Sequence, residues 1–183
     1  MPGGGTLTLS PDMVETTVPG FRLADPDGVA EAIEAREVIE RSLARLAALR
    51  RTELDVARLQ AAVAAMRTAG NDDDAFGEHD LAFHIALWDA AHNELLAGTL
   101  AALRELVVDM IAFFVRGAAA ERRMAPLADH HAELVDAVVG QDADRAALIV
   151  TQMMDRLRVE AGRRVERAPL RQAEPDTPKR RLP

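Results

Sequence analysis

Residues 73–91, DDAFGEHDLAFHIALWDAA, decide the fold. The apolar residues of this stretch recur at helical spacing and form one face of a helix: Phe76, Phe83 and Leu87. Asp80 and His84 fall on the same face, four residues apart, so their side chains lie one above the other. Burying an ionisable group without a partner is costly, so this face predicts a polar site inside a packed helical protein.

Helical patterns with clear start and stop signals continue on both sides of this stretch. Polar caps, prolines and glycines set the expected bounds of five further helices: 26–49, 52–70, 93–114, 126–140 and 142–165. The helix that follows Asn93 would become two helices if it breaks near Gly117. Because the connections are short, neighbouring helices should pack antiparallel. The sequence therefore predicts an all-α antiparallel bundle of six to seven helices.

The two ends of the chain differ in composition from this helical part. Residues 1–25 are rich in glycine, proline and threonine, which predicts a flexible leader or a turn followed by a short strand. Residues 167–183 contain four prolines, which predicts a disordered tail. We therefore expect the helical domain to span residues 26–166.

The composition excludes several classes of protein. The chain has 183 residues, which suits one domain, and the lack of cysteine excludes disulfides, thiolate metal sites and a cysteine nucleophile. With 22 Lys and Arg against 30 Asp and Glu, the formal net charge of -8 argues against direct DNA binding by most of the chain. No apolar run approaches the roughly 20 residues of a membrane span, and no signal-peptide pattern is present. We expect a soluble, cytoplasmic protein that does not contact a membrane.

Three more polar residues fall on faces that the helical period assigns to the core. His131 lies within the apolar stripe of the helix 126–140, and Arg36 and Glu40 are in register with the apolar face of the helix 26–49. Two interpretations fit Arg36 and Glu40: an ion pair four residues apart on a half-exposed face, or a ligand-binding role. The spacing favours the ion pair.

Two interpretations fit Asp80, His84 and His131. The three side chains could converge on one divalent cation, and one carboxylate with two imidazoles suits Zn²⁺, Mn²⁺, Ni²⁺ or Fe²⁺. Alternatively, Asp80 and His84 form a buried hydrogen bond, and His131 is an unrelated core histidine. The spacing alone favours the second interpretation, because an Asp/His pair four residues apart is a weak signal.

The motifs around these residues resemble a known domain. Residues 36–40, REVIE, resemble the first helix of the ligand-sensing C-terminal (FCD) domain of FadR-type regulators in the GntR family. The run DLAFH at residues 80–84, followed by Asn93, is similar to that domain's Asp-x-x-Phe-His motif and to the asparagine that opens its next helix. Residues 131–146 are similar to its segment of His, Ala, Gly-x-Asp and Ala. The likeness covers residues 27–165 in the right order and spacing.

This resemblance implies a dimeric bundle with an internal pocket for a small organic acid or sugar acid. Many members hold a divalent metal such as Zn, Mn or Ni there through one aspartate and three histidines, and Asp80, His84 and His131 match three of these positions. Met153 occupies the fourth-ligand position, where the family has histidine. A thioether is a weak ligand for Zn²⁺ or Mn²⁺, so we expect a lower metal affinity, with metal-free sensing as the alternative. Arg36 is the candidate for a charge-assisted contact with the effector carboxylate.

The resemblance also implies a winged helix-turn-helix ahead of the sensor domain. The start of the leader, residues 1–10, looks like the closing hairpin of such a wing, so we expect a truncated regulator, with a standalone sensor as the alternative. DNA binding is then expected only through the missing N-terminal domain.

The expected function is effector sensing and dimerisation in a bacterial GntR/FadR-type transcription regulator, without enzymatic activity. A helical metalloenzyme is one alternative. None of the five histidines follows a glutamate by three residues, as the carboxylate-bridged di-iron bundles require. A helical interaction module without a ligand is the other alternative, and it predicts that changes at Asp80 and His84 alter stability only.

Overall fold

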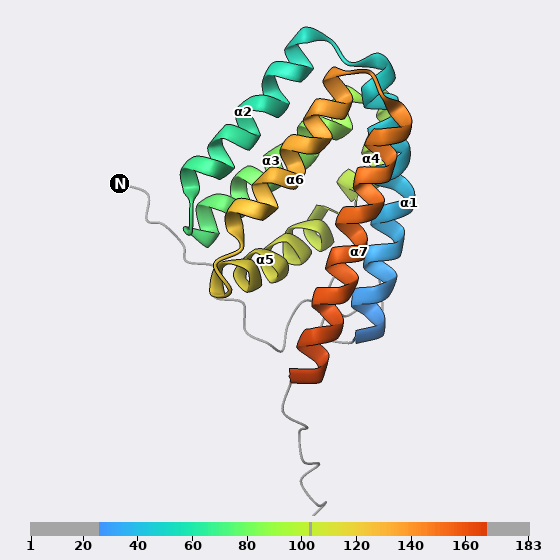
Figure 1. Ribbon diagram of the computed structural model, residues 1–183. Helices are drawn as coiled ribbons and strands as arrows, with labels where there is room; N and C mark the ends of the chain where they lie inside the picture. Colours follow the sequence, from blue (N-terminus) through green and yellow to red (C-terminus); the bar gives the residue numbers. More distant parts are fainter. Residues whose placement is uncertain (1–25, 103, 168–183) are drawn as a thin grey trace, which may run out of the picture.

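The computed structural model describes residues 26–102 and 104–167, and in this part of the chain all of the regular structure is helical. Its elements are α1 (Pro26–Arg50), α2 (Glu53–Ala69), α3 (Asp73–Ala90), α4 (Glu94–Ala102), α5 (Arg104–Ala120), α6 (Met124–Val139) and α7 (Ala143–Arg167). These helices confirm the predicted all-α bundle (Figure 1). The predicted leader and all but the first residue of the predicted tail lie outside the described residues. None of the described helices is long and apolar enough to cross a membrane.

The helix ends show why the sequence signals were informative. Thr52 caps α2 through a capping box with Asp55, and Asp142 accepts a hydrogen bond from the backbone N–H of Arg145 at the start of α7. The prediction for α6 was wrong by two residues, because the helix begins at Met124 and not at Pro126. Proline is tolerated there because the N–H groups of the first helical turn have no acceptor within the helix.

The expected break near Gly117 was also wrong. Gly117 lies inside α5, and the expected helix 93–114 corresponds to α4 and the first part of α5, with residue 103 outside the described residues. The apolar stripe continues in phase across both helices, from Leu100 to Val107. α4 packs against α1 and α3, and α5 packs against α3 and α6.

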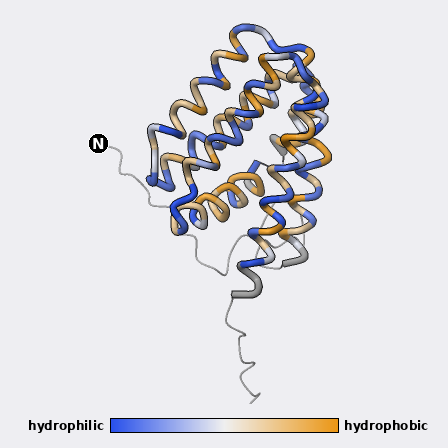
Figure 2. The backbone as a smooth tube through the Cα atoms, in the orientation of Figure 1, coloured by the Kyte–Doolittle hydropathy of each residue, from blue (hydrophilic) through white to orange (hydrophobic). Residues whose placement is uncertain are grey.

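The packing places α3 at the centre of the described bundle. α1 and α7 lie side by side and antiparallel along their lengths, and α3 contacts α1, α2, α4 and α5 (Figure 1). Figure 2 shows hydrophobic residues alternating with hydrophilic ones along α2 and α7, whereas α5 is hydrophobic along most of its length. The polar residues on the inner faces of α1, α3 and α6 are buried in a core that is otherwise largely apolar.

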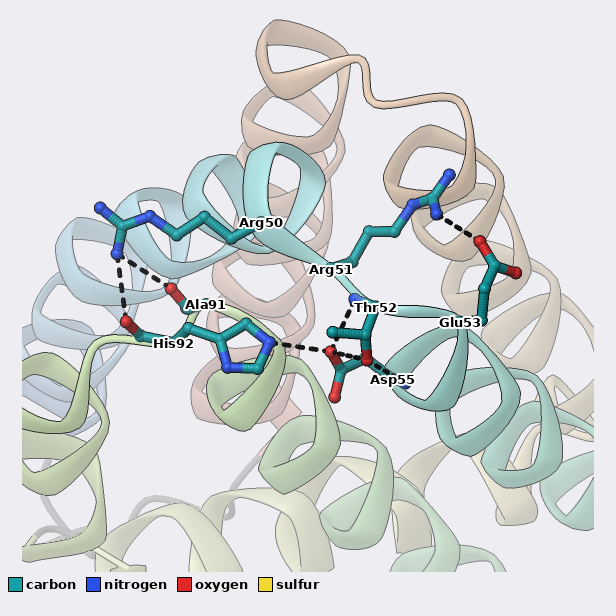
Figure 3. Close-up of polar contacts among 7 residues, drawn as sticks. All are labelled: Arg50, Arg51, Thr52, Glu53, Asp55, Ala91 and His92. Atoms are coloured by element: carbon teal, nitrogen blue, oxygen red, sulfur yellow. Dashed lines mark hydrogen bonds and ion pairs between the residues drawn. The ribbon is translucent and has the colours of Figure 1, made fainter.

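A polar corner joins the α1–α2 turn to the end of α3 (Figure 3). Arg50 donates hydrogen bonds to the backbone oxygens of Ala91 and His92, each at 3.2 Å. His92 Nε2 lies 2.9 Å from Asp55 Oδ2, which also accepts from the N–H and hydroxyl of Thr52. Burial favours the neutral acid, but the bonds from Thr52 and His92 outweigh it and lower the pKa of Asp55. This corner fixes the end of α3 against α1 and α2.

Candidate metal and effector site

The structure brings Asp80, His84 and His131 together. Asp80 and His84 lie on the inner face of α3 and His131 lies on the inner face of α6, with exposed fractions of 5%, 4% and 1%. Asp80 Oδ1 is 2.9 Å from His131 Nε2 and 3.6 Å from His84 Nε2. One ligand atom from each residue lies within 4.8 Å of the other two. His131 is therefore not an unrelated core histidine, because it faces the same carboxylate as His84.

Local contacts fix the orientation of the His131 ring. His131 Nδ1 donates a hydrogen bond to the carbonyl oxygen of Leu127, one turn earlier on α6, at 2.9 Å. This bond assigns the proton to Nδ1 and directs Nε2 at Asp80, as for a histidine that binds a metal through Nε2. The ring of Phe83 packs edge-on against His131, with centroids 4.7 Å apart. The apolar wall and the backbone acceptor together hold the imidazole in place.

Asp80 and His131 stabilise each other's charged forms. Burial favours the neutral acid, but His131, then His84 and Arg36, outweigh it and lower the pKa of Asp80. Burial likewise favours the neutral imidazole, but Asp80 and the Leu127 carbonyl outweigh it and raise the pKa of His131. A cation at this position would meet one anionic oxygen among two imidazole nitrogens.

A second ion pair lies directly against His84. Arg36 Nε donates to Glu40 Oε1 at 2.9 Å, and the two residues are 3% and 1% exposed. The expected ion pair is present, but the expectation of a half-exposed face was wrong, because this face of α1 packs against α3. Burial raises the pKa of Glu40, but the nearby Arg36 and His84 outweigh burial and lower it to about 2.

Arg36 and Glu40 contact opposite sides of the His84 ring. Arg36 Nη2 lies 3.3 Å from His84 Nε2, and Glu40 Oε2 lies 3.3 Å from His84 Nδ1. A guanidinium can only donate, so Nε2 is the acceptor and the proton of the neutral ring is on Nδ1, beside Glu40. The sequence placed Glu40 in register with the core, but it could not show that Glu40 reaches a side chain on another helix.

Unpartnered polar atoms are concentrated in this cluster. Five buried side-chain polar atoms of the described residues lack a hydrogen-bond partner, and four of them belong to Asp80, His84, Trp88 and His131. Asp80 Oδ1 and His131 Nε2 are close enough for a hydrogen bond but are not aligned for one. Buried polar atoms without partners are rare in folded proteins and call for an explanation such as an ion or a ligand.

The other three histidines of the chain are not part of this cluster. His79 and His130 are half-buried, and the exposed His92 pairs with Asp55 at the polar corner. Met153, at the expected fourth-ligand position, is half-buried on α7 and packs against the core. Trp88 packs in the core and is 3% exposed.

A family match identifies the kind of domain that carries this cluster. The family model described as FCD domain matches residues 31–156, a range that contains every residue of the cluster. This chain belongs to the FCD domain family. Its membership confirms the predicted resemblance to the ligand-binding domain of FadR-type GntR regulators.

Curated relatives of this FCD domain are named as transcription regulators. It is 31% identical to the galactonate operon transcriptional repressor of Escherichia coli (strain K12) over 122 residues, which are 67% of this chain and 52% of the repressor. It is 40% identical to the HTH-type transcriptional regulator LutR of Bacillus subtilis (strain 168) over 74 residues, which are 40% of this chain and 34% of LutR. The chain thus spans about half, or less, of the length of these relatives.

The fold is shared with a solved structure. The structure of E. coli McbR/YncC superposes on this chain with a TM-score of 0.65, covering 76% of this chain and 66% of the other at 16% sequence identity. The similarity confirms the predicted architecture, a helical bundle of the kind found in FadR C-terminal domains.

Proposed function

We propose that this FCD domain is the effector-sensing and dimerisation part of a bacterial transcription regulator. In this proposal it binds a small organic or sugar acid beside a divalent cation and has no enzymatic activity. The observation that carries the proposal is the buried convergence of Asp80, His84 and His131, with one unpartnered polar atom in each. The names of the relatives support the regulatory role, and LutR is named as an HTH-type regulator. DNA binding would therefore belong to another domain.

The three residues fit a divalent cation by donor type and by spacing. Zinc bonds of about 2.0–2.2 Å to nitrogen and oxygen place tetrahedral ligand atoms about 3.4 Å apart. The distances of 2.9 Å and 3.6 Å from Asp80 Oδ1 to the two imidazole nitrogens lie on either side of this value. A bound cation would supply a Lewis-acidic centre for the effector carboxylate. Its binding would also give a partner to Asp80 Oδ1 and His131 Nε2, which otherwise lack one.

Arg36 links the metal position to an acidic effector. It donates to His84 Nε2, and this nitrogen has only one lone pair, so Arg36 and a cation cannot both use it. When the cation is bound, Arg36 stays attached to Glu40 through Nε, and its Nη2 becomes available to a carboxylate. Metal and effector binding are then coupled favourably, and by linkage each raises the affinity for the other.

The test is thermal unfolding with a panel of hydroxy acids and sugar acids, with and without Zn²⁺ or Mn²⁺. The panel includes galactonate and L-lactate, acids that the names of two relatives contain. A ligand at about 100 times its Kd stabilises by about 2.7 kcal/mol, which corresponds to a shift of about 5–10 °C for a domain of this size. We expect one acid to give such a shift, and a larger one with metal. His131→Gln should abolish the shift, and the adjacent His130→Gln, on the same helix, should preserve it.

Two results would refute this proposal. One is that no acid shifts the unfolding temperature, with or without metal. The other is that His131→Gln lowers the unfolding temperature but leaves any ligand response intact, as a purely structural cluster would. Size-exclusion chromatography with light scattering tests the dimer separately, because a monomer at micromolar concentration would contradict the dimerisation role.

A further inference from the structure

Trp88 continues the line of site residues along α3. Asp80, His84 and Trp88 are spaced four residues apart, so their side chains stack on one face of the helix. The indole and imidazole rings of Trp88 and His84 are 6.3 Å apart between centroids and tilted by 39°. Trp88 is 3% exposed, so its side chain is part of the interior that surrounds the cluster.

The indole N–H of Trp88 is buried and lacks a hydrogen-bond partner among the described residues. Leaving such a donor without an acceptor costs about 1–3 kcal/mol, and buried tryptophans usually have a partner. The other three unpartnered atoms of the cluster belong to groups that can bind a cation, namely a carboxylate and two imidazoles. An indole nitrogen cannot bind a cation, because it has a proton and no available lone pair. A metal held through Asp80 Oδ1 and His131 Nε2 therefore accounts for two of these atoms, and the third, His84 Nδ1, lies 3.3 Å from Glu40 Oε2. The N–H of Trp88 stays unexplained.

We infer that Trp88 is a binding residue for the effector, with its N–H donating a hydrogen bond to an oxygen of the acid. This inference rests on the proposed function and adds a residue that selects the ligand. Arg36 supplies positive charge from α1, and Trp88 supplies a directed neutral donor from α3. An acid whose oxygen reaches the indole satisfies the donor, and an acid of the wrong shape leaves it unpaired. A site built in this way discriminates strongly between similar acids.

The chain provides an internal probe for this contact. Trp88 is its only tryptophan, and it has no tyrosine, so the intrinsic fluorescence excited at the indole band comes from the proposed site alone. We expect titration with the effector acid, in the presence of saturating Zn²⁺, to shift or quench this emission. L-lactate and galactonate are the first probes, with acetate as the simplest carboxylate.

Calorimetry of Trp88→Phe measures the energetic role of the N–H. Hydrogen bonds to charged groups contribute about 1.5–3 kcal/mol, so loss of this donor should weaken binding of the acid about 10- to 100-fold. Zinc affinity should change less than about threefold, because the indole does not bind the cation. Replacing the sole tryptophan biosynthetically with benzothienylalanine keeps the ring size and removes only the N–H. It should show the same loss of acid affinity, which separates the hydrogen bond from a packing defect.

A matched control is Phe114→Leu, another buried aromatic residue, whose ring contact is with Phe113 and not with a histidine. It should lower stability and leave acid affinity unchanged. The inference is overturned if both tryptophan replacements bind the acid as tightly as the parent chain does, and in that case the proposed function still stands. If the parent chain binds neither metal nor any acid, both the proposed function and this inference fail.

Discussion

Replacing Asp80 with asparagine should rescue part of the stability lost when His131 is replaced by leucine. The two side chains are 2.9 Å apart and at most 7% exposed, so each is the nearest countercharge of the other in the core. Burial opposes both charges, and their attraction outweighs it, which lowers the pKa of Asp80 and raises the pKa of His131. The His131→Leu variant therefore retains a buried carboxylate without its nearest cation.

The cost of each substitution is limited by the free energy needed to neutralise the residue left behind. Each unit between pH and pKa is about 1.4 kcal/mol, so protonating an aspartate of ordinary pKa about 3.9 at pH about 7 costs about 4 kcal/mol. A histidine of ordinary pKa about 6.5 loses its proton there almost without cost. Arg36 and His84 still compensate Asp80 in part, so His131→Leu should destabilise by about 2–4 kcal/mol. Asp80→Asn should destabilise by only about 1 kcal/mol.

Urea unfolding followed by far-ultraviolet circular dichroism at neutral pH, with EDTA present, measures these free energies. The double variant should be more stable than His131→Leu alone, because it no longer contains an uncompensated carboxylate. As a control, Glu53→Gln, an exposed carboxylate at the start of α2, and His131→Leu should have additive effects, because the two residues share no partner. The reasoning is refuted if the costs at Asp80 and His131 simply add, or if Asp80→Asn is the more damaging single change.

Three further predictions concern the corner and the edges of the site. Asp55→Asn should destabilise by about 1 kcal/mol at neutral pH. Because the pKa of Asp55 is lowered in the folded chain, the extra stability that aspartate gives over asparagine should disappear as pH falls through this lowered pKa. A difference in unfolding temperature that does not change with pH would contradict this prediction. Met153→His should tighten Zn²⁺ binding at least about tenfold in calorimetry, whereas Gln152→His, at an exposed position of the same helix, should not change it. Equal effects of the two substitutions on zinc affinity would show that Met153 is not part of the site. Arg36→Lys should weaken acid binding about tenfold with little change in Zn²⁺ affinity, and Arg41→Lys, at an exposed position, should change neither affinity. An acid affinity that is unchanged in Arg36→Lys would exclude Arg36 as the contact with the effector.

The sequence predicted the helices well where their ends have local signals. Thr52, Gly70 and Asp142 mark helix ends through capping chemistry that depends only on neighbouring residues. The start of α6 at Met124 has no such signal, because Arg123 caps it without a side-chain hydrogen bond. Pro126 marked only the first turn of this helix and not its first residue.

The candidate site could be predicted as a set of residues and not as a geometry. Period and polarity were sufficient to place Asp80, His84 and His131 on inner faces, because each breaks an apolar stripe. Nothing in the sequence showed that Glu40 contacts His84, because that contact depends on how α1 and α3 pack. No sequence pattern indicates that the N–H of Trp88 lacks an acceptor, because this is visible only in three dimensions.

Native mass spectrometry of the purified chain, before and after EDTA and across a zinc titration, tests the central claim most directly. We predict one divalent ion per chain in the parent and in His79→Ala, and none in His84→Ala, which removes a proposed ligand from the same helix. The account is contradicted if the parent stays metal-free throughout the titration, or if His84→Ala retains the ion as fully as His79→Ala does.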